Sequence, residues 1–189
     1  MIGRGRWARG AVVLALLGAT LGAALDGLHT HFGKTAYAHP VVWLMAWWVP
    51  LLFAGAFTLG LARPLLERVL GAAGPMPSRA GVAAAFGAFV LAYVVTVLPL
   101  SWPVVAAIVL VLFAVSWWLF DRSPAGLAVA LVASVGGPAV ESFLVGRGLF
   151  VHFQGLAFGV PGWLPCLYLV AGVALTTLAE RLVDGAEGS

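Results

Sequence analysis

The residues that could carry chemistry are few, and the most informative are two carboxylic acids set inside long apolar runs. Asp26 stands near the end of the first run, and Glu141 stands in the second half of the fifth, just past Gly136-Gly137-Pro138. Ionisable groups inside a membrane are costly, so each suggests a functional role, such as bordering a polar cavity or binding a lipid headgroup. The alternative is interfacial solvation, or pairing of the acids with each other, with Arg147 or with a histidine.

The other reactive groups do not form a catalytic or metal-binding pattern. His29, His31 and His39 lie in one polar segment, but no thiolate or well-spaced carboxylate completes a metal-ligand set. Cys166 follows Pro165 in an apolar helix, where we expect a small buried side chain. The chain has neither a phosphate-cradling glycine-rich loop nor a paired-carboxylate motif. We therefore predict no enzyme activity, no metal and no cofactor.

Six apolar runs must position these residues, and they cover about 11–32, 39–62, 80–98, 102–120, 124–146 and 160–179. Each run is close to the ~17–25 residues that a helix needs to cross a bilayer, where backbone polar groups must be paired internally. Of the 189 residues, 62% are hydrophobic and 9% are charged, and the mean hydropathy is +1.06. Soluble domains carry about 25% charged residues. The sequence therefore predicts an all-α integral membrane protein, with residues 1–189 forming a single domain of six transmembrane helices.

The basic residues predict how these helices are oriented. When the chain is threaded through six spans, only Lys34 and Arg147 fall on one side of the membrane. The remaining basic residues share the other side, which the positive-inside rule assigns to the cytoplasm together with both termini: Arg4, Arg6, Arg9, Arg63, Arg68, Arg79, Arg122 and Arg181. The net charge of +3 therefore concerns orientation and anionic lipid headgroups, not nucleic acid. The N-terminal arginines, the first run and Ala36-Tyr37-Ala38 also imitate a signal peptide, but the polar spacer before this site is too long.

Local signals predict where some helices start or bend. Pro50 is expected to bend the second helix, because it removes a backbone donor. The segment Arg63–Leu70 has one apolar and one charged face, which predicts a short interfacial helix. Ser123-Pro124 is a start signal for the fifth helix. Gly136-Gly137-Pro138 predicts a kink or an unwound turn within it. Trp48 lies deeper than the interfacial tryptophans and is expected to line packing or a cavity.

Three sequence blocks resemble those of the Insig (insulin-induced gene) family of membrane proteins. They are AWWVP (Ala46–Pro50), WWLFDRSPAGL (Trp117–Leu127) and WLPC (Trp163–Cys166). The family carries near-identical blocks in this order and at similar separations, and FLVGRG (Phe143–Gly148) is similar to the family's FLVYNG. The resemblance spans roughly all six helices. It implies six transmembrane helices with both termini in the cytoplasm.

The resemblance also implies a function and a set of site residues. Animal Insig proteins bind oxysterols in an intramembrane cavity, and in that state they hold Scap or present HMG-CoA reductase for degradation. The family's partner-binding aspartate matches Asp121, its sterol-pocket tryptophan matches Trp117, and a pocket phenylalanine corresponds to Phe89. We therefore expect a ligand site formed by Trp117, Phe89, Trp48, Glu141 and Asp26. We expect Asp121 and Arg122 to form a partner site at an exposed cytoplasmic junction, where removal of the Asp121 carboxylate leaves folding nearly unchanged.

Departures from the family pattern alter the expected ligand. The helix 4 glutamine that faces the sterol hydroxyl in animal members falls near Val104, and Asp26 stands where relatives have Asn. The composition, rich in Ala, Gly, Val and Arg with a single lysine, is typical of a high-GC prokaryote. We therefore predict a non-enzymatic lipid sensor or regulator that binds a diacylglycerol- or sterol-like lipid. Its place would be the plasma membrane of a prokaryote, or the endoplasmic reticulum of a eukaryote.

A different class of protein also fits these residues. A small transporter or lipid-translocating protein could use Glu141 and the Gly-Gly-Pro break in the fifth helix as a polar path. A membrane-protein partner at the junction of the fourth and fifth helices, and a homo-oligomer, are further possible assemblies.

Overall fold

The computed structural model describes residues 4–185 and shows, within them, six helices that are long and apolar enough to cross a membrane. This confirms the prediction of an all-α, multi-pass integral membrane protein. The first span consists of α1 (Arg4–Leu17), a π-helical turn η1 (Gly18–Gly22) and α2 (Ala23–His31). The second consists of α3 (Val49–Thr58), a 3-10 turn η2 (Leu59–Leu61) and α4 (Ala62–Leu70). The others are α5 (Arg79–Val97), α6 (Trp102–Ser116) with the π-helical turn η3 (Trp117–Asp121), α7 (Pro124–Gly146), and α8 (Leu164–Val183), which follows the 3-10 turn η4 (Ala157–Gly159).

The second span begins later than the predicted residue 39. The helix α3 starts at Val49, and Pro50 lies in its first turn, where the missing N–H leaves no helical hydrogen bond unmade. Trp43 and Leu44 have φ angles of 47° and 65°, so the chain before Val49 turns through left-handed conformations that no helix can contain. The apolar run in the sequence therefore begins as a loop and becomes helical only from Val49.

Three further local predictions have different outcomes. Ser123 does cap α7, because its hydroxyl accepts a hydrogen bond of 2.8 Å from the Gly126 N–H. The segment predicted to be an interfacial helix forms α4, which continues the second span through η2 and ends at Leu70, just before Gly71 with φ 64°. Of the predicted kink or unwound turn, the unwound turn is wrong, since Gly136-Gly137-Pro138 stays helical within α7. Membrane helices tolerate proline where neighbouring groups satisfy the freed carbonyl.

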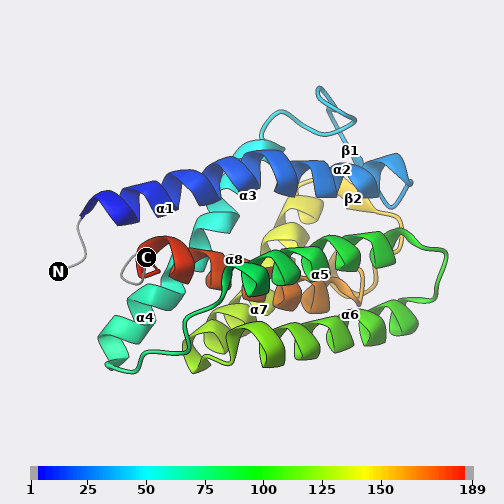
Figure 1. Ribbon diagram of the computed structural model, residues 1–189. Helices are drawn as coiled ribbons and strands as arrows, with labels where there is room; N and C mark the ends of the chain where they lie inside the picture. Colours follow the sequence, from blue (N-terminus) through cyan, green and yellow to red (C-terminus); the bar gives the residue numbers. More distant parts are fainter. Residues whose placement is uncertain (1–3, 186–189) are drawn as a thin grey trace.

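The helix α8 lies at the centre of the bundle, with the other spans arranged around it (Figure 1). Small residues allow this close packing. A Cβ atom on Gly172 would stand 2.6 Å from the Cα of Ala130 in α7, and a Cβ atom on Gly60 would stand 2.6 Å from the carbonyl oxygen of Leu175. A larger residue at either position would collide with the neighbouring backbone. These two glycines therefore allow α7 and η2 to pack closely against α8.

Two short strands join the loops at one end of the bundle. The strand β1 (Thr35–Tyr37) pairs antiparallel with β2 (Phe150–His152), in the register Thr35↔His152 and Tyr37↔Phe150. The strands connect the chain after α2 with the chain after α7, segments that are more than one hundred residues apart. This pairing was not predicted, because neither segment alternates over more than three residues.

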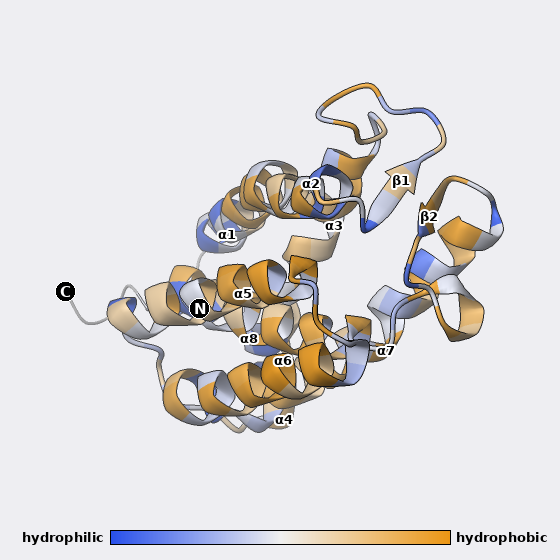
Figure 2. Ribbon diagram, turned by 90° about the vertical axis from the view of Figure 1, so that its right-hand side faces the viewer, coloured by the Kyte–Doolittle hydropathy of each residue, from blue (hydrophilic) through white to orange (hydrophobic). Residues whose placement is uncertain are grey.

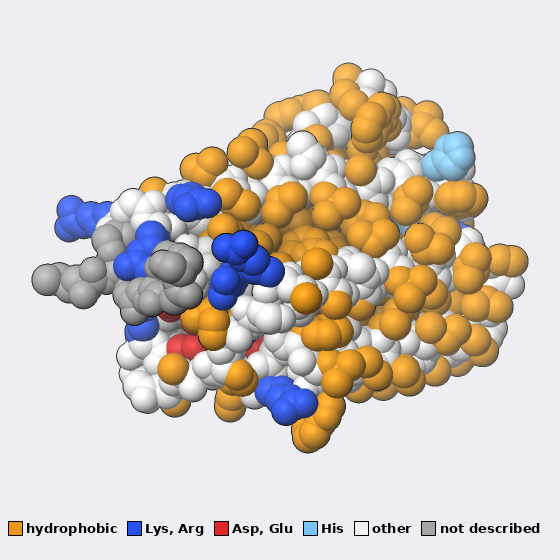
Figure 3. Space-filling view, viewed as in Figure 1, with side chains coloured by type: hydrophobic (Ala, Val, Ile, Leu, Met, Phe, Trp, Pro, Cys, Tyr) orange, Lys and Arg blue, Asp and Glu red, His pale blue; other side chains and the backbone are white. Residues whose placement is uncertain are grey.

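The surface divides into an apolar band and a basic end. Hydrophobic residues run along the helices (Figure 2), and Lys and Arg side chains gather around the end where both termini lie (Figures 1 and 3). The described residues thus place the two chain ends on the same side of the bundle. Which side of the membrane this is remains a prediction from the positive-inside rule.

Candidate functional site

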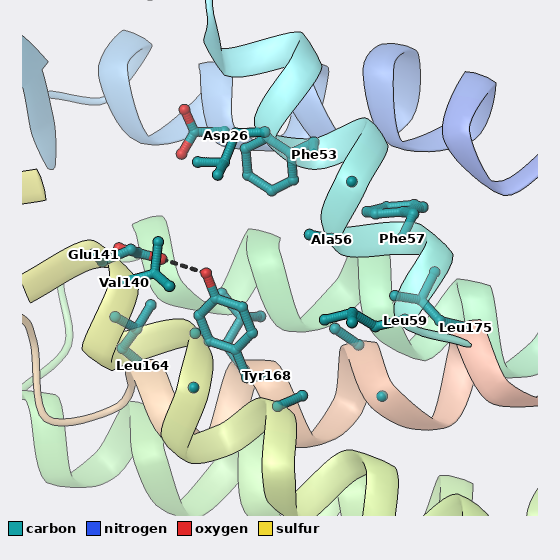
Figure 4. A pocket seen from close by; sticks show the side chains of 18 of the residues that line it. Asp26, Phe53, Ala56, Phe57, Leu59, Val140, Glu141, Leu164, Tyr168 and Leu175 are labelled. Carbon is teal, nitrogen blue, oxygen red and sulfur yellow. Dashed lines mark hydrogen bonds between the residues drawn. The ribbon is translucent and has the colours of Figure 1, made fainter. Parts of the chain in front are cut away.

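A cavity of about 530 Å³ lies between the second and fifth spans, and α8 forms its inner wall (Figure 4). Most of its wall is apolar and includes Phe53, Phe57, Phe89, Val129, Leu164, Leu167 and Leu175. Cavities of this size that are lined by hydrophobic and aromatic groups, with a few polar groups among them, are typical of small-molecule sites. The lining therefore favours an apolar ligand.

The cavity opens sideways rather than toward an aqueous end. The helices α3 and α7 have little direct contact with each other, and the lining residues at the gap between them are exposed. These residues are Leu51, Gly55, Leu59, Val132, Gly136 and Val140. Because this surface is apolar and lies along two membrane-spanning helices, the mouth faces the hydrocarbon region of a bilayer. An apolar molecule could pass through it without crossing water.

Polar groups gather at the end of the cavity that is far from the chain termini. The Tyr37 hydroxyl donates a 2.7 Å hydrogen bond to Oδ2 of Asp26. The Tyr168 hydroxyl donates a 2.7 Å hydrogen bond to Oε1 of Glu141, and Nε2 of His152 lies 2.7 Å from Oε2 of the same carboxylate. The strand pair brings Tyr37 and His152 to this place, one from each loop. The cavity is therefore amphipathic, with one polar end and an apolar body.

The environment of Tyr37 keeps its hydroxyl a donor. Burial, together with the nearby Asp26 carboxylate, raises the pKa of Tyr37 well above its usual value. The phenol therefore stays protonated at physiological pH and holds the Asp26 side chain in one orientation.

A second polar contact lies deeper in the bundle. Nε2 of His29 is 2.8 Å from the Thr96 hydroxyl, and the imidazole stacks on Tyr93 with the ring centroids 5.1 Å apart. The edge-to-face contact of Tyr93 with Phe89, at 5.3 Å, fixes the other side of the phenol ring. Within the part of the chain that the structure describes, no residue forms a hydrogen bond with the Tyr93 hydroxyl, which lies at the cavity wall.

Gly137 explains why the Gly-Gly-Pro segment matters although it does not unwind. A Cβ atom at this position would collide with the ring of Tyr168, whereas one on Gly136 would meet nothing within 4 Å. The glycine therefore lets Tyr168 lie across α7 and reach Glu141 (Figure 4). The segment is a packing site for an aromatic ring.

The structure brings most of the predicted ligand residues together, but not all of them. Asp26, Trp48, Phe89 and Glu141 line the cavity. Trp117 does not, because its indole packs against the core and its Nε1 donates a 3.4 Å hydrogen bond to the Ser123 carbonyl oxygen. Sequence reasoning missed five polar lining or supporting residues, namely His29, Tyr37, Tyr93, His152 and Tyr168. Tyr93 could have been found, since it stands four residues after Phe89 on one helical face.

Asp121 is not exposed as predicted, since only 1% of its surface is accessible. Its Oδ1 lies 2.8 Å from Nη1 of Arg63, which is fully buried, and accepts a 2.6 Å hydrogen bond from the Ser123 hydroxyl. The Thr176 hydroxyl in α8 donates to Oδ2 at 3.1 Å. Arg63 also pairs with Glu67 at 2.9 Å. The carboxylate thus joins α4, η3 and α8 in a buried ion-pair network.

Arg122 differs from its neighbour in both contacts and exposure. Its guanidinium lies over the Trp118 ring at 5.0 Å from the centroid, and the residue is exposed with φ 54°. The guanidinium that pairs with Asp121 is therefore that of Arg63 and not that of the adjacent Arg122. Of the two predicted partner residues, only Arg122 can touch another molecule directly.

The six spans and the side-opening amphipathic cavity define this chain as a multi-pass membrane protein with a cavity among its helices. No protein-family model matches the chain. It is 40% identical over 185 residues to the INSIG protein homolog of Mycolicibacterium vanbaalenii, covering 92% of this chain and 86% of that protein. It is 25% identical over 181 residues to human insulin-induced gene 1 protein, covering 92% of this chain and 65% of that protein.

Solved structures agree with these relatives. The crystal structure of MvINS, a mycobacterial Insig homologue from Mycobacterium vanbaalenii, matches with a TM-score of 0.80 and 34% identity over 93% of this chain and 94% of that one. A cross-linked trimer of MvINS matches with a TM-score of 0.83 and 33% identity over the same shares. The chain therefore belongs to the Insig family, and the mycobacterial relative agrees with the prokaryotic composition.

Proposed function

We propose that this protein is a non-enzymatic lipid-binding regulator, which holds a diacylglycerol- or sterol-like lipid in the cavity between α3 and α7. The observation that carries the proposal is the shape and chemistry of this cavity. Its body is apolar, its mouth opens along the apolar surface, and its polar end holds Asp26 and Glu141. The polar group of such a lipid would lie at the polar end of the cavity, and its apolar chains would fill the apolar body.

Filling the cavity tests this proposal. Ala56 lines the cavity on α3 (Figure 4), so Ala56→Phe should occupy the space that the lipid chains would use. Native mass spectrometry of the purified protein, with lipid extraction, should show a bound lipid on the wild type and much less on the variant. Ala114→Phe is the matched control, because Ala114 is exposed on α6 and does not line the cavity. Equal lipid content in all three proteins would refute the cavity as the binding site.

We also propose an assembly surface, in line with the partner predictions. The exposed Arg122 and the π-helical turn before it would contact a membrane-protein partner, while buried Asp121 holds the turn in shape. The cross-linked trimer of MvINS supports a homo-oligomer as a second assembly. Pull-down of partners from native membranes with the wild type and Arg122→Ala would test the first. Measurement of molar mass in detergent would test the second.

A further inference from the structure

The polar end of the cavity is acidic, and this restricts what it can hold. Asp26 and Glu141 both line the cavity, whereas no Lys or Arg does so among the described residues. A phosphate or carboxylate group brought to this end would therefore be buried in a medium of low dielectric constant without a Lys or Arg to pair with it, which is costly. A neutral or cationic group would not incur this cost.

The two acids differ in how much of their hydrogen-bonding capacity is in use. Both oxygens of Glu141 have partners, in Tyr168 and His152. Asp26 uses only Oδ2, which accepts from Tyr37, and its Oδ1 has no hydrogen-bond partner in the described part of the chain. Asp26 is therefore the acid with an oxygen left for a ligand.

Tyr93 offers the complementary group. Its side chain is only 6% exposed, its ring is held between His29 and Phe89, and its hydroxyl has no hydrogen bond to a described residue. Asp26 and Tyr93 line the same cavity. The hydroxyl lies at the cavity wall without a partner among the described residues, so a polar group of a ligand in the cavity could pair with it.

We propose that Asp26 and Tyr93 form a subsite for the polar end of the lipid, which selects a hydrogen-bond donor, a hydroxyl or an ammonium, over phosphate or carboxylate. This rests on the proposed function, that the cavity holds a lipid. A hydroxyl would donate to Asp26 and accept from Tyr93. An ammonium would donate to Asp26 and form an ion pair with its carboxylate. Asp26 is thus a specificity-determining residue.

Three lipids with identical acyl chains test the subsite. Delipidated protein in mild detergent is titrated with dioleoylglycerol, with a dioleoyl lipid that ends in a primary amine, and with dioleoyl phosphatidic acid. We expect the first two to bind at least about tenfold more tightly than the third, the size expected for a hydrogen bond to a charged group. Asp26→Asn should reduce this preference about tenfold, while Tyr37 can still donate to the amide oxygen. Tyr93→Phe should weaken dioleoylglycerol binding about fivefold, because the ring contacts remain but the hydroxyl is gone.

Asp184→Asn is the matched control, because it makes the same chemical change at the far end of the bundle, where Asp184 pairs with Arg68. It should leave all three affinities unchanged. If phosphatidic acid binds the wild type as tightly as dioleoylglycerol, or if Asp26→Asn retains the wild-type preference, the subsite is refuted while lipid binding stands. If none of the three lipids binds, the proposed function fails together with the subsite.

Discussion

Arg63 is the centre of a buried ion-pair network that connects α4 with η3 and α8. It is fully buried and pairs with Asp121 at 2.8 Å and with Glu67 at 2.9 Å, while Glu180 lies 3.6 Å away. Removing one partner from a buried ion pair leaves an uncompensated charge, which typically costs about 3–5 kcal/mol. The network therefore makes Asp121 a structural residue, contrary to the expectation that its carboxylate can be removed without effect on folding.

Asp121→Ala should accordingly lower the thermal unfolding temperature of the purified protein by many degrees. This single substitution removes the ion pair with Arg63 and the hydrogen bonds from Ser123 and Thr176. Arg122→Ala, at the next position but exposed, should change the stability by no more than about 1 kcal/mol. Equal melting temperatures for Asp121→Ala and the wild type would show that the network does not hold the helices together.

A substitution at Glu141 distinguishes the proposed lipid-binding function from the alternative transporter function. In Glu141→Gln the amide can still accept from Tyr168, so bound lipid should stay within a few fold of the wild type. Reconstituted liposomes should show no proton or ion flux with either protein. A flux that is present in the wild type and lost in Glu141→Gln would favour the transporter instead.

At the level of the helices, Gly137 is one of the positions where α7 and α8 pack closely. Gly137→Ala would push a methyl group into the Tyr168 ring, so we expect Tyr168 to move from Glu141 and lipid content to fall. Gly136→Ala is the matched control, since it meets nothing within 4 Å and alanine favours a helix. Extraction and quantification of lipid from both variants checks this prediction. If the two variants behave alike, the close contact has no role in binding.

The start of a helix could be predicted where residues next to it carry the signal. Ser123-Pro124 starts α7 because the cap and the proline act within one turn. The loop before Val49 was missed because Val41, Val42, Trp43 and Leu44 are apolar like the helices, although they are exposed at one end of the span. Hydropathy cannot distinguish an apolar loop from an apolar helix.

The candidate site was predicted only in part, for a related reason. Asp26 and Glu141 stood out because charge is rare in a span. Their partners Tyr37, His152 and Tyr168 come from two loops and a third helix, so their contacts are set by tertiary packing and by a strand pair of three residues. Arg63 appeared to be one more basic residue at a helix end, and only the packing of α4 against α8 shows that it is buried.

At the scale of the whole molecule, the basic end predicts orientation. Single cysteines placed at Arg79 and at Arg147, in a background where Cys166 is replaced by alanine, should be labelled from opposite sides of the membrane. We expect Arg79 to be cytoplasmic, and Arg147 and Lys34 to be outside. Labelling of the Arg147 position from the cytoplasm would contradict the threading of the six spans.

Photo-crosslinking can show whether a lipid occupies the cavity between α3 and α7. A diacylglycerol with a photoreactive group in one acyl chain is added to purified protein, irradiated, and mapped by peptide mass spectrometry, with excess dioleoylglycerol as competitor. We expect labelling of the cavity residues of α3, α5 and α7, such as Phe53, Phe89 and Val132, and we expect the competitor to reduce it. Labelling confined to the outward surface of α6, at Val111 and Val115, and unaffected by the competitor, would contradict the proposed binding site.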